Sequence, residues 1–188
     1  VSDLTLFKNL LGDGSQWGIS IQYTVQPEPK GIAHAFSLAE EFASGEGAAL
    51  VLGDNIFYGA GLESKLQAAC AQVDGATVFA YQVENPSDFG VVEFDREKHA
   101  ISLEEKPREP KSNFAVTGLY FYDSTAFDLI RKLKPSNRGE LEITDLNWLY
   151  LEQKKLTVRT LGQGYAWLDT GTHESILDAA NFIHSTEE

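Results

Sequence analysis

The sequence predicts a single α/β domain, and three observations favour this class. Along the first half of the chain, segments with apolar residues at helical spacing alternate with short apolar runs that are typical of strands. Hydrophobic residues make up 43% of the 188 residues, which is enough for one buried core. No stretch rich in Pro, Gly or Ser divides the chain. Strands that alternate with helices in this way predict a parallel sheet with helices on both faces.

The first half of the chain contains six expected elements. Apolar residues over 4–11 have helical spacing, and Gly12 is placed to end that helix. Residues 19–25 alternate between apolar and polar or small side chains, as a half-buried strand does. Residues 48–52 are continuously apolar, which predicts a strand covered on both faces. The remaining expected elements are helices at 32–42 and 62–73 and a buried strand at 76–81.

The second half of the chain is richer in expected strands. Two runs, 91–94 and 101–104, flank the polar turn 95–99 and predict an antiparallel hairpin. Pro135 is placed to stop a short helix before it. This half therefore adds an antiparallel portion, and the whole architecture is expected to be mixed. Its other expected elements are strands at 114–122 and 156–161 and helices at 127–133, 142–152 and 176–183.

The composition excludes several functional classes. Fifteen Lys and Arg against 28 Asp and Glu give a net charge of −13, and such a surface repels the phosphate backbone of DNA or RNA. A small phosphorylated ligand is still compatible, because one local cation or a metal ion could hold it. The single cysteine, Cys70, excludes an internal disulfide and favours a reducing compartment such as the cytoplasm. No run approaches the roughly 20 apolar residues of a membrane helix, and no signal peptide opens the sequence.

Two aspartates that follow predicted strands are candidates for a magnesium site. Asp54 comes after the apolar run 48–52, and Asp169 comes after Trp167 and Leu168. Ligands of open α/β sheets bind at the carboxyl ends of strands. Mg²⁺ takes few carboxylates and keeps waters and phosphates as its other ligands. For each aspartate alone, a turn or helix-capping role is the commoner one.

Three further segments carry side chains suited to a phosphorylated nucleotide or sugar. Lys106, at the end of an expected strand, can hold a phosphate as a point charge. Arg138 lies in a polar loop, from which its guanidinium can bind phosphate oxygens bidentately. In the loop 26–31, Gln26 carries both the donor and the acceptor that recognition of a base edge requires. A solvated strand end for Lys106 and a rigid surface turn for 26–31 are the simpler alternatives.

Other catalytic constellations are absent from the sequence. It contains no P-loop lysine motif, no G-x-G-x-x-G after a strand and no G-x-S-x-G elbow. The four histidines are scattered without the spacing of metal ligands. Cys70 lies in an expected apolar helix, which predicts a small core residue rather than a nucleophile.

Six short motifs, spread in order along the chain, carry the most specific signal. They are LGDGSQWG at 11–18, QPEPKG at 26–31, VLGDNIFYG at 51–59, LEEKP at 103–107, PSNRGELEITD at 135–145 and YAWLDTGT at 165–172. Together they closely resemble the glucose-1-phosphate thymidylyltransferase family. The resemblance covers essentially the whole chain. It implies one nucleotidyltransferase domain over 1–188, with the three-layer, Rossmann-like mixed sheet of the nucleotide-diphospho-sugar transferases.

The resemblance also implies a reaction and a set of residues. In that family dTTP and α-D-glucose 1-phosphate give dTDP-glucose and pyrophosphate with Mg²⁺, at the entry to dTDP-rhamnose and the deoxysugars of lipopolysaccharide O-antigen. The implied partners are these substrates and further copies of the chain, as a homotetramer. Asp54 and Asp169 would hold Mg²⁺, and Lys106 and Arg138 would grip the sugar phosphate. Binding of the nucleotide and sugar is implied for Gln26, Pro29, Gly31, Asn55, Gly90, Glu105, Val116 and Trp167.

The sequence departs from the family pattern at its ends and at one site position. Family members begin with a strand, a G-G-x-G-T-R-L loop and a lysine-containing segment, and they continue with helices beyond residue 188. The chain starts after that loop and contains no Met, so we expect a piece of a longer enzyme with little turnover of its own. Phe89 stands where the family has Tyr, which removes a hydroxyl near the sugar.

Three alternatives to thymidylyl transfer stay open. A non-catalytic module that binds a nucleotide sugar would have the same motifs without triphosphate activation. A related transferase that uses UTP is also compatible, because Gln26 could serve either pyrimidine. A metal-dependent phosphohydrolase could use Asp54 and Asp169, although no base that would activate water is evident.

Overall fold

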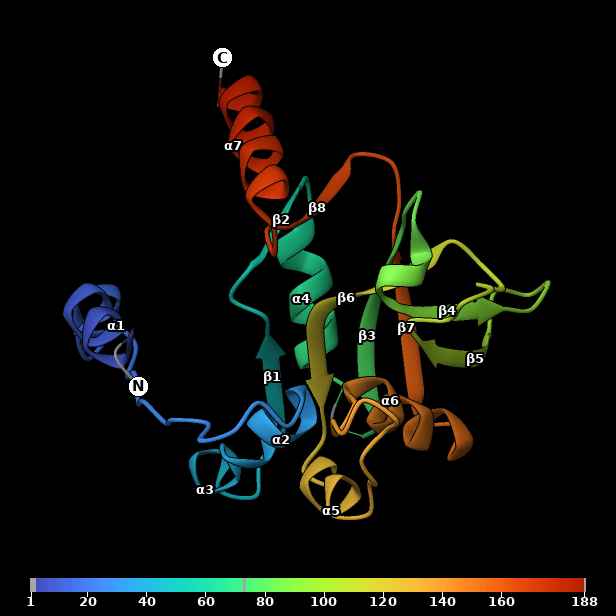
Figure 1. Cartoon of the computed structure of the whole chain (residues 1–188), viewed down its shortest axis with the longest axis horizontal. Coiled ribbons are helices and arrows are strands. Elements are labelled where there is room, and N and C mark those ends of the chain that lie inside the picture. The colour runs from blue at the N-terminus through green and yellow to red at the C-terminus, as the bar shows by residue number, and fades with distance from the viewer. Residues whose placement is uncertain (1–2, 73, 188) are drawn as a thin grey trace.

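The computed structural model describes residues 3–72 and 74–187 and has a curled sheet with helices on both faces (Figure 1). The strands are β1 Ala48–Val51, β2 Asn55–Gly59, β3 Ala76–Gln82, β4 Gly90–Phe94, β5 Ala100–Glu105, β6 Phe114–Tyr122, β7 Leu156–Leu161 and β8 Tyr165–Asp169. The helices are α1 Asp3–Leu11, α2 Ile32–Ser37, α3 Glu40–Ala43, α4 Leu62–Cys70, α5 Ala126–Ile130, α6 Ile143–Glu152 and α7 His173–Glu187. Short 3₁₀ turns lie at Ser15–Trp17 and Pro86–Asp88.

The long strand β6 organises the main sheet. It pairs antiparallel with β3 along one edge and with β1 and then β4 along the other. β7 extends the sheet beyond β3 in parallel, and β5 closes the opposite end as the partner of β4 in the expected hairpin. β1, β3 and β7 therefore run in one direction, but β6 separates β1 from β3. The mixed sheet is confirmed, whereas the purely parallel sheet expected from the first half alone is wrong.

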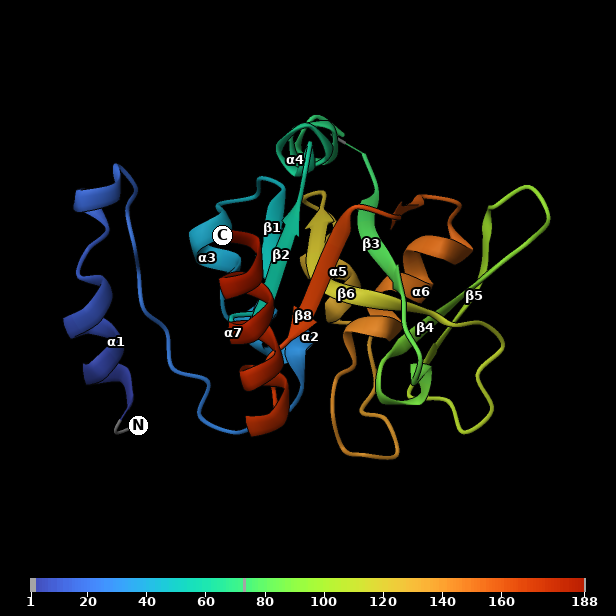
Figure 2. The same ribbon diagram turned by 90° about the horizontal axis from the view of Figure 1, so that it is seen from above.

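Two apolar layers hold the helices on the sheet. On one face, α2, α5 and α6 cover side chains such as Val78, Tyr120 and Tyr122. On the other face, α4 covers Phe79 and Leu119 (Figure 2). The alternation of residues along β3 and β6 sends successive side chains into these two layers. The three-layer arrangement is thus confirmed.

A small second sheet, in which β2 pairs antiparallel with β8, was not expected from the sequence. The turn residues Gly53 and Asp54 come directly before Asn55, so the sequence pattern indicated a turn there and not the start of a strand. Pairing aligns Asn55 with Asp169 and Gly59 with Tyr165. This sheet brings the two distant aspartate motifs to one point of the fold.

The structure corrects three expected elements. Residues 19–25 form no strand, because no described segment offers them a ladder of backbone hydrogen bonds, and Ile19 is 57% exposed. The helix expected at 32–42 is interrupted between α2 and α3. β1 is covered on one face only, and Val51 is 56% exposed.

The ends of two helices also differ from expectation. α4 ends at Cys70, and residue 73, the last of the expected helix 62–73, lies outside the described residues. Cys70 is exposed, so its assignment to the core is wrong. α1 ends at Leu11, and Gly12 follows it with a φ of +58°, as expected. The helix lies apart from the sheet in both views (Figures 1 and 2), and none of its residues is buried. Within the described part of the chain, no helix has the length and apolar character needed to cross a bilayer.

Candidate functional site

Most of the sequence-predicted site residues meet at one pocket. It encloses about 150 Å³ and lies where the ends of β5 and β8 approach β6 and α6. The predicted residues that line it are Asn55, Gly90, Glu105, Lys106, Val116, Trp167 and Asp169. These seven residues come from five strands, or directly follow one, and their positions in the sequence do not reveal that they meet.

The two candidate metal ligands lie side by side at the start of the β2–β8 pair. The backbone N–H and the hydroxyl of Thr170 both donate to the carbonyl oxygen of Asp54, each at 2.8 Å. Gly171 faces both carboxylates: a Cβ atom there would lie 3.2 Å from Asp169 Oδ1 and 3.9 Å from Asp54 Oδ2. The expectation that the fold joins Asp54 and Asp169 is therefore met.

The donor set at this point fits a hard divalent cation that is only partly held by protein. Mg²⁺ prefers oxygen ligands and is usually bound by one or two carboxylates, with waters and substrate phosphates completing its shell. Among the described residues, no group of three or more His, Cys, Asp or Glu side chains forms a cage for a metal ion. A site of two aspartates is thus suited to a cation that arrives with a phosphate.

Asn55 is held in one orientation by three hydrogen bonds. Its Oδ1 accepts from the backbone N–H of Gly118 at 2.9 Å and from Trp167 Nε1 at 2.6 Å. Its Nδ2 donates to Asp54 Oδ1 at 2.9 Å. The same residue therefore orients a candidate metal ligand, the ring of Trp167 and the backbone of β6. A Cβ atom at Gly118 would lie 2.5 Å from Asn55 Oδ1, so this contact requires glycine.

Glu105 forms the polar floor of the pocket. Its Oε2 accepts a 2.5 Å hydrogen bond from Thr144 Oγ1. Burial of the Glu105 side chain, together with the nearby charge of Glu142, raises its pKa. A Cβ atom at Gly90 would lie 2.7 Å from Thr144 Oγ1 and 3.3 Å from Glu105 Oε2. Gly90 therefore leaves room for this pair, and Thr144 is a pocket residue that the sequence analysis did not assign.

Lys106 follows Glu105 directly and turns the chain out of the strand. Its φ is +43°, a left-handed conformation uncommon for a non-glycine residue, and its backbone N–H donates to Phe89 O at 3.0 Å. The ring of Phe89 packs edge-on against Trp167, with centroids 5.1 Å apart. Phe89 thus contributes an aromatic wall, where the family pattern would add a hydroxyl.

Arg138 lies beside the pocket rather than in its wall. Its guanidinium is 3.5 Å from Glu105 Oε1, 3.3 Å from Glu140 Oε1 and 3.7 Å from Glu142 Oε1. The structure therefore brings Arg138 to the rim next to Glu105, as a phosphate-binding role requires.

The loop 26–31 does not line the pocket, so Gln26, Pro29 and Gly31 stand apart from the other predicted residues. Gln26 Nε2 donates to Gly31 O at 3.1 Å and lies 3.0 Å from His34 Nδ1. Gly31 has a φ of +95°, and a Cβ atom there would lie 2.4 Å from Leu141 O. Gly31 is thus needed for the close approach of this loop to the segment before α6, and Ile32, the next residue, reaches the pocket.

Comparison with known proteins identifies the family. The profile described as "Nucleotidyl transferase" matches residues 2–186. This chain belongs to the nucleotidyl transferase family. It is 59% identical to a glucose-1-phosphate thymidylyltransferase of Neisseria meningitidis and 51% identical to one of Mycolicibacterium smegmatis, over 98% and 99% of its own length. It spans 64% of the length of each of these relatives, which is less than two thirds.

Solved structures of nucleotidyl transferases have the same fold. A Bacillus anthracis protein assigned as a glucose-1-phosphate thymidylyltransferase, in complex with sucrose, aligns with a TM-score of 0.86 and 41% identity. That alignment covers 95% of this chain and 71% of the other. A UDP-glucose pyrophosphorylase complexed with UDP-glucose aligns with a TM-score of 0.74 at 23% identity, over 95% and 72% of the two chains, and shows the fold alone. The resemblance drawn from the six motifs is confirmed.

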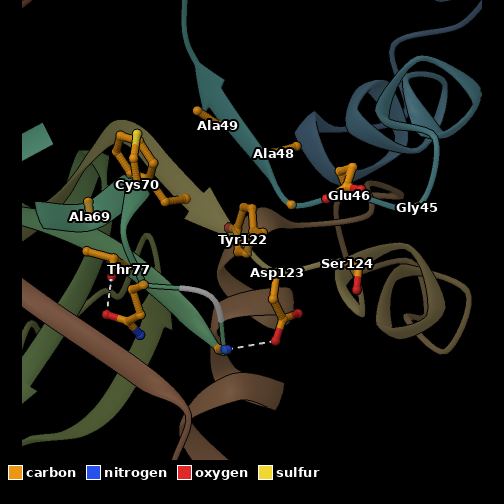
Figure 3. Close-up of a pocket in the computed structure, with 14 residues that line it drawn as sticks. Gly45, Glu46, Ala48, Ala49, Ala69, Cys70, Thr77, Tyr122, Asp123 and Ser124 are labelled. Carbon is orange, nitrogen blue, oxygen red and sulfur yellow. Dashed lines mark hydrogen bonds between the residues drawn. The ribbon is translucent and has the colours of Figure 1, made fainter. Parts of the chain in front are cut away.

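This nucleotidyl transferase chain has a second, larger pocket that contains none of the predicted residues. It encloses about 430 Å³ between β1, the end of α4 and the loop after β6 (Figure 3). Asp123 Oδ2 accepts the backbone N–H of Gly75 at 2.7 Å, the contact dashed in Figure 3. Burial opposes ionisation of Asp123, but hydrogen bonds from Thr125, Tyr150 and Gly75 hold its pKa below the ordinary value. Asp123 is thus satisfied by the protein itself, and we interpret this pocket as structural.

Proposed function

We propose that this chain forms the part of a glucose-1-phosphate thymidylyltransferase that binds the sugar phosphate and the metal. The reaction transfers a thymidylyl group from dTTP to α-D-glucose 1-phosphate, giving dTDP-glucose and pyrophosphate. One observation carries the proposal: Asp169, Asn55, Glu105 and Lys106 line one pocket, and Asp54 is hydrogen-bonded to Asn55 beside it, although these residues come from distant motifs. The names of the relatives agree with this reaction.

The sugar occupies the pocket with its hydroxyls toward Glu105 and Asn55. Glu105 is fixed by Thr144, and Asn55 is fixed by Gly118 and Trp167, so both side chains are oriented before the ligand arrives. Oriented polar groups bind hydroxyls at low entropic cost. Gly90 and Val116 complete the wall and leave space for the sugar ring.

The remaining site residues neutralise the negative charges of the sugar phosphate and the nucleotide phosphates. The oxygen of the sugar phosphate must attack the α-phosphorus of the nucleotide, and the two anions repel each other. Lys106, from the pocket wall, and Arg138, from the rim, bind the sugar phosphate. Asp54 and Asp169 would hold Mg²⁺, which would neutralise charge on the nucleotide phosphates. Because the attacking phosphate is already an anion, the site needs no general base. Positioning and electrostatic stabilisation then supply the catalysis.

The loop 26–31 is proposed to recognise the base. Gln26 offers a carboxamide, and Pro29 and Gly31 shape the backbone around it. In the ligand-free arrangement, Gln26 Nε2 is already bonded to Gly31 O, so its Oε1 is the atom offered to the N–H of a pyrimidine. Thymine and uracil present the same N–H, so the contact admits UTP as well as dTTP.

Wider features of the family are proposed with the reaction. They are a homotetrameric assembly, a cytoplasmic location and a role in supplying dTDP-glucose for dTDP-rhamnose and O-antigen sugars. Size-exclusion chromatography with light scattering tests the assembly, since a purely monomeric protein would contradict it.

The reaction is tested by measuring pyrophosphate release from dTTP and glucose 1-phosphate with MgCl₂. The expected result is slow release, in line with the little turnover expected of this chain, that requires all three components and yields dTDP-glucose. UTP in place of dTTP measures base preference. Tight binding of dTDP-glucose without any release would favour the non-catalytic module. Release of phosphate without a sugar acceptor would favour a phosphohydrolase.

A further inference from the structure

Arg138 is held in a cage of acidic side chains at the rim of the pocket. Glu105, Glu140 and Glu142 all lie within ion-pair distance of its guanidinium. The Arg138 side chain is 44% exposed, whereas that of Glu142 is 8% exposed. A half-exposed arginine on a loop samples many rotamers unless something fixes the loop that carries it. The question is which contact fixes Arg138.

One serine connects the backbone of Arg138 to the buried Glu142. Ser136 Oγ donates to Glu142 Oε1 at 2.7 Å and accepts the backbone N–H of Arg138 at 3.1 Å. Glu142 directly precedes α6, which packs on β5, so its position is set by the core of the molecule. The loop is closed at its base as well, because Ser136 N–H donates to Glu140 O at 2.8 Å. Ser136 thus links the backbone of Arg138 to Glu142, at the start of α6.

The charge of Glu142 does not help Arg138 to bind an anion. A carboxylate 3.7 Å from the guanidinium competes with a phosphate for it. The same charge disfavours ionisation of neighbouring carboxylates, since it contributes to the raised pKa of Glu105 and, after burial, of Asp145. Burying a carboxylate is also costly. What Glu142 supplies is a fixed acceptor for Ser136.

We propose that the Ser136–Glu142 hydrogen bond is a clasp that positions Arg138 for the phosphate of the sugar substrate. The clasp consists of Ser136 and Glu142, and both are positioning residues that touch no substrate. This inference rests on the proposed function, because it takes Arg138 as a ligand of the sugar phosphate. It adds that geometry, and not the charge of Glu142, determines how tightly Arg138 binds.

Four variants separate geometry from charge. Ser136→Ala and Glu142→Ala both remove the clasp. Glu142→Gln keeps an oxygen acceptor for Ser136 and removes only the charge. Ser102→Ala is the matched control, because Ser102 Oγ also donates to a glutamate, Glu93 Oε2, at 2.7 Å, but on the hairpin outside the pocket.

The readout is the dissociation constant of glucose 1-phosphate by calorimetry, with that of dTTP measured in parallel. Ser136→Ala and Glu142→Ala are expected to weaken binding of glucose 1-phosphate about ten- to 150-fold, the range for one hydrogen bond to a charged group. Glu142→Gln should bind at least as tightly as the unmodified protein, and Ser102→Ala should bind equally. The affinity for dTTP should stay within about twofold in all four.

A double variant tests whether Ser136 and Glu142 act as one unit. Ser136→Ala combined with Glu142→Ala should be no weaker than either alone, and neither should matter once Arg138 is replaced by Ala. Equal weakening by Glu142→Gln and Glu142→Ala would overturn the clasp, because charge would then be the cause. An unchanged affinity in Ser136→Ala, where folding is least at risk, would overturn it too.

The same measurements keep the two proposals apart. If Arg138→Ala weakens glucose 1-phosphate but Ser136→Ala does not, the clasp is wrong and the proposed function stands. If Arg138→Ala leaves the affinity unchanged, Arg138 is not a phosphate ligand, and the clasp fails together with that part of the proposed function.

Discussion

At the scale of single residues, Asn55 organises the candidate site. Its three hydrogen bonds link Asp54, β6 and Trp167, so an amide that never changes charge fixes the position of one candidate metal ligand relative to the sugar pocket. An aspartate at this position could not donate to Asp54, and a leucine would leave Gly118 N–H and Trp167 Nε1 unpaired. The identity of this residue is therefore dictated by donors and acceptors rather than by size.

The aspartate pair leads to the first prediction. Asp169→Asn replaces one carboxylate by a neutral amide of the same shape, so the fold should persist while the divalent cation loses a ligand. We expect at least tenfold weaker binding of Mn²⁺, measured by electron paramagnetic resonance, and a rate about 100-fold lower in the pyrophosphate assay. Asp178→Asn, at an exposed position of α7, is the control. Unaltered Mn²⁺ binding in Asp169→Asn would remove Asp169 from the metal site.

Lys106 leads to the second prediction. Lys106→Ala removes the cation nearest the pocket, so glucose 1-phosphate should bind about tenfold or more weakly, while dTTP is affected less. Its left-handed backbone could itself disfavour alanine. Lys98→Ala controls for this, because Lys98 also has a positive φ, +67°, in the turn of the same hairpin. Equal losses for both substrates in Lys106→Ala would contradict its assignment to the sugar phosphate.

At the scale of elements, the strands that follow from a local apolar pattern were predicted from the sequence. The strand that depends on pairing with a distant segment was missed. β6 and β7 have the bounds expected from the sequence, because both strands pair with β3 along their whole apolar runs. β2 was missed, since its existence depends on β8 more than 100 residues later. The strand expected at 19–25 has the right alternation, but alternation alone supplies no hydrogen-bonding partner.

The same reasoning applies to the site. Asp54, Asp169 and Lys106 were candidates because their motifs end strands, where ligands bind in this class of fold. Glu105 was a candidate because the family resemblance implies it. Thr144 and Gly118 were not assigned, because their roles arise only from contacts across the pocket, with Glu105 and Asn55. Sequence pattern therefore locates the chemistry, while the supporting contacts become visible only in three dimensions.

Gly31 leads to a prediction about the junction between the loop 26–31 and α6. Gly31→Ala would bring a Cβ atom to 2.4 Å from Leu141 O at a φ of +95°, so the loop would have to move away from the segment before α6. We expect a loss of roughly 2 kcal/mol or more in the free energy of unfolding, measured with urea. Gly162→Ala should lower the free energy of unfolding much less, because no atom lies within 4 Å of a Cβ atom at that position. Similar stabilities for the two variants would show that this loop is not tightly docked.

At the scale of the whole molecule, Asp123 joins elements that are far apart in the sequence. Its carboxylate accepts the N–H of Gly75 before β3, the N–H and hydroxyl of Thr125 before α5, and the hydroxyl of Tyr150 in α6. All four groups donate, so only an ionised carboxylate satisfies them together. In a chain with 28 acidic residues, this one is required to stay charged at the end of β6.

That requirement predicts how stability depends on pH. Despite burial, these hydrogen bonds hold the pKa of Asp123 in the folded state below its ordinary value of 3.8, so above about pH 5 its contribution is fully present. As the pH falls, the unfolded chain takes up the proton first, and the contribution is lost while the pH passes through the folded-state pKa. Asp123→Asn should therefore lower the free energy of unfolding by roughly 2 kcal/mol at pH 7 and flatten the decline in stability below about pH 5. Urea unfolding at a series of pH values measures both effects, with Asp178→Asn, at an exposed position of α7, as the control. A decline as steep in Asp123→Asn as in the unmodified chain would mean that other carboxylates cause the acid sensitivity, and Asp123 would then be a packing residue.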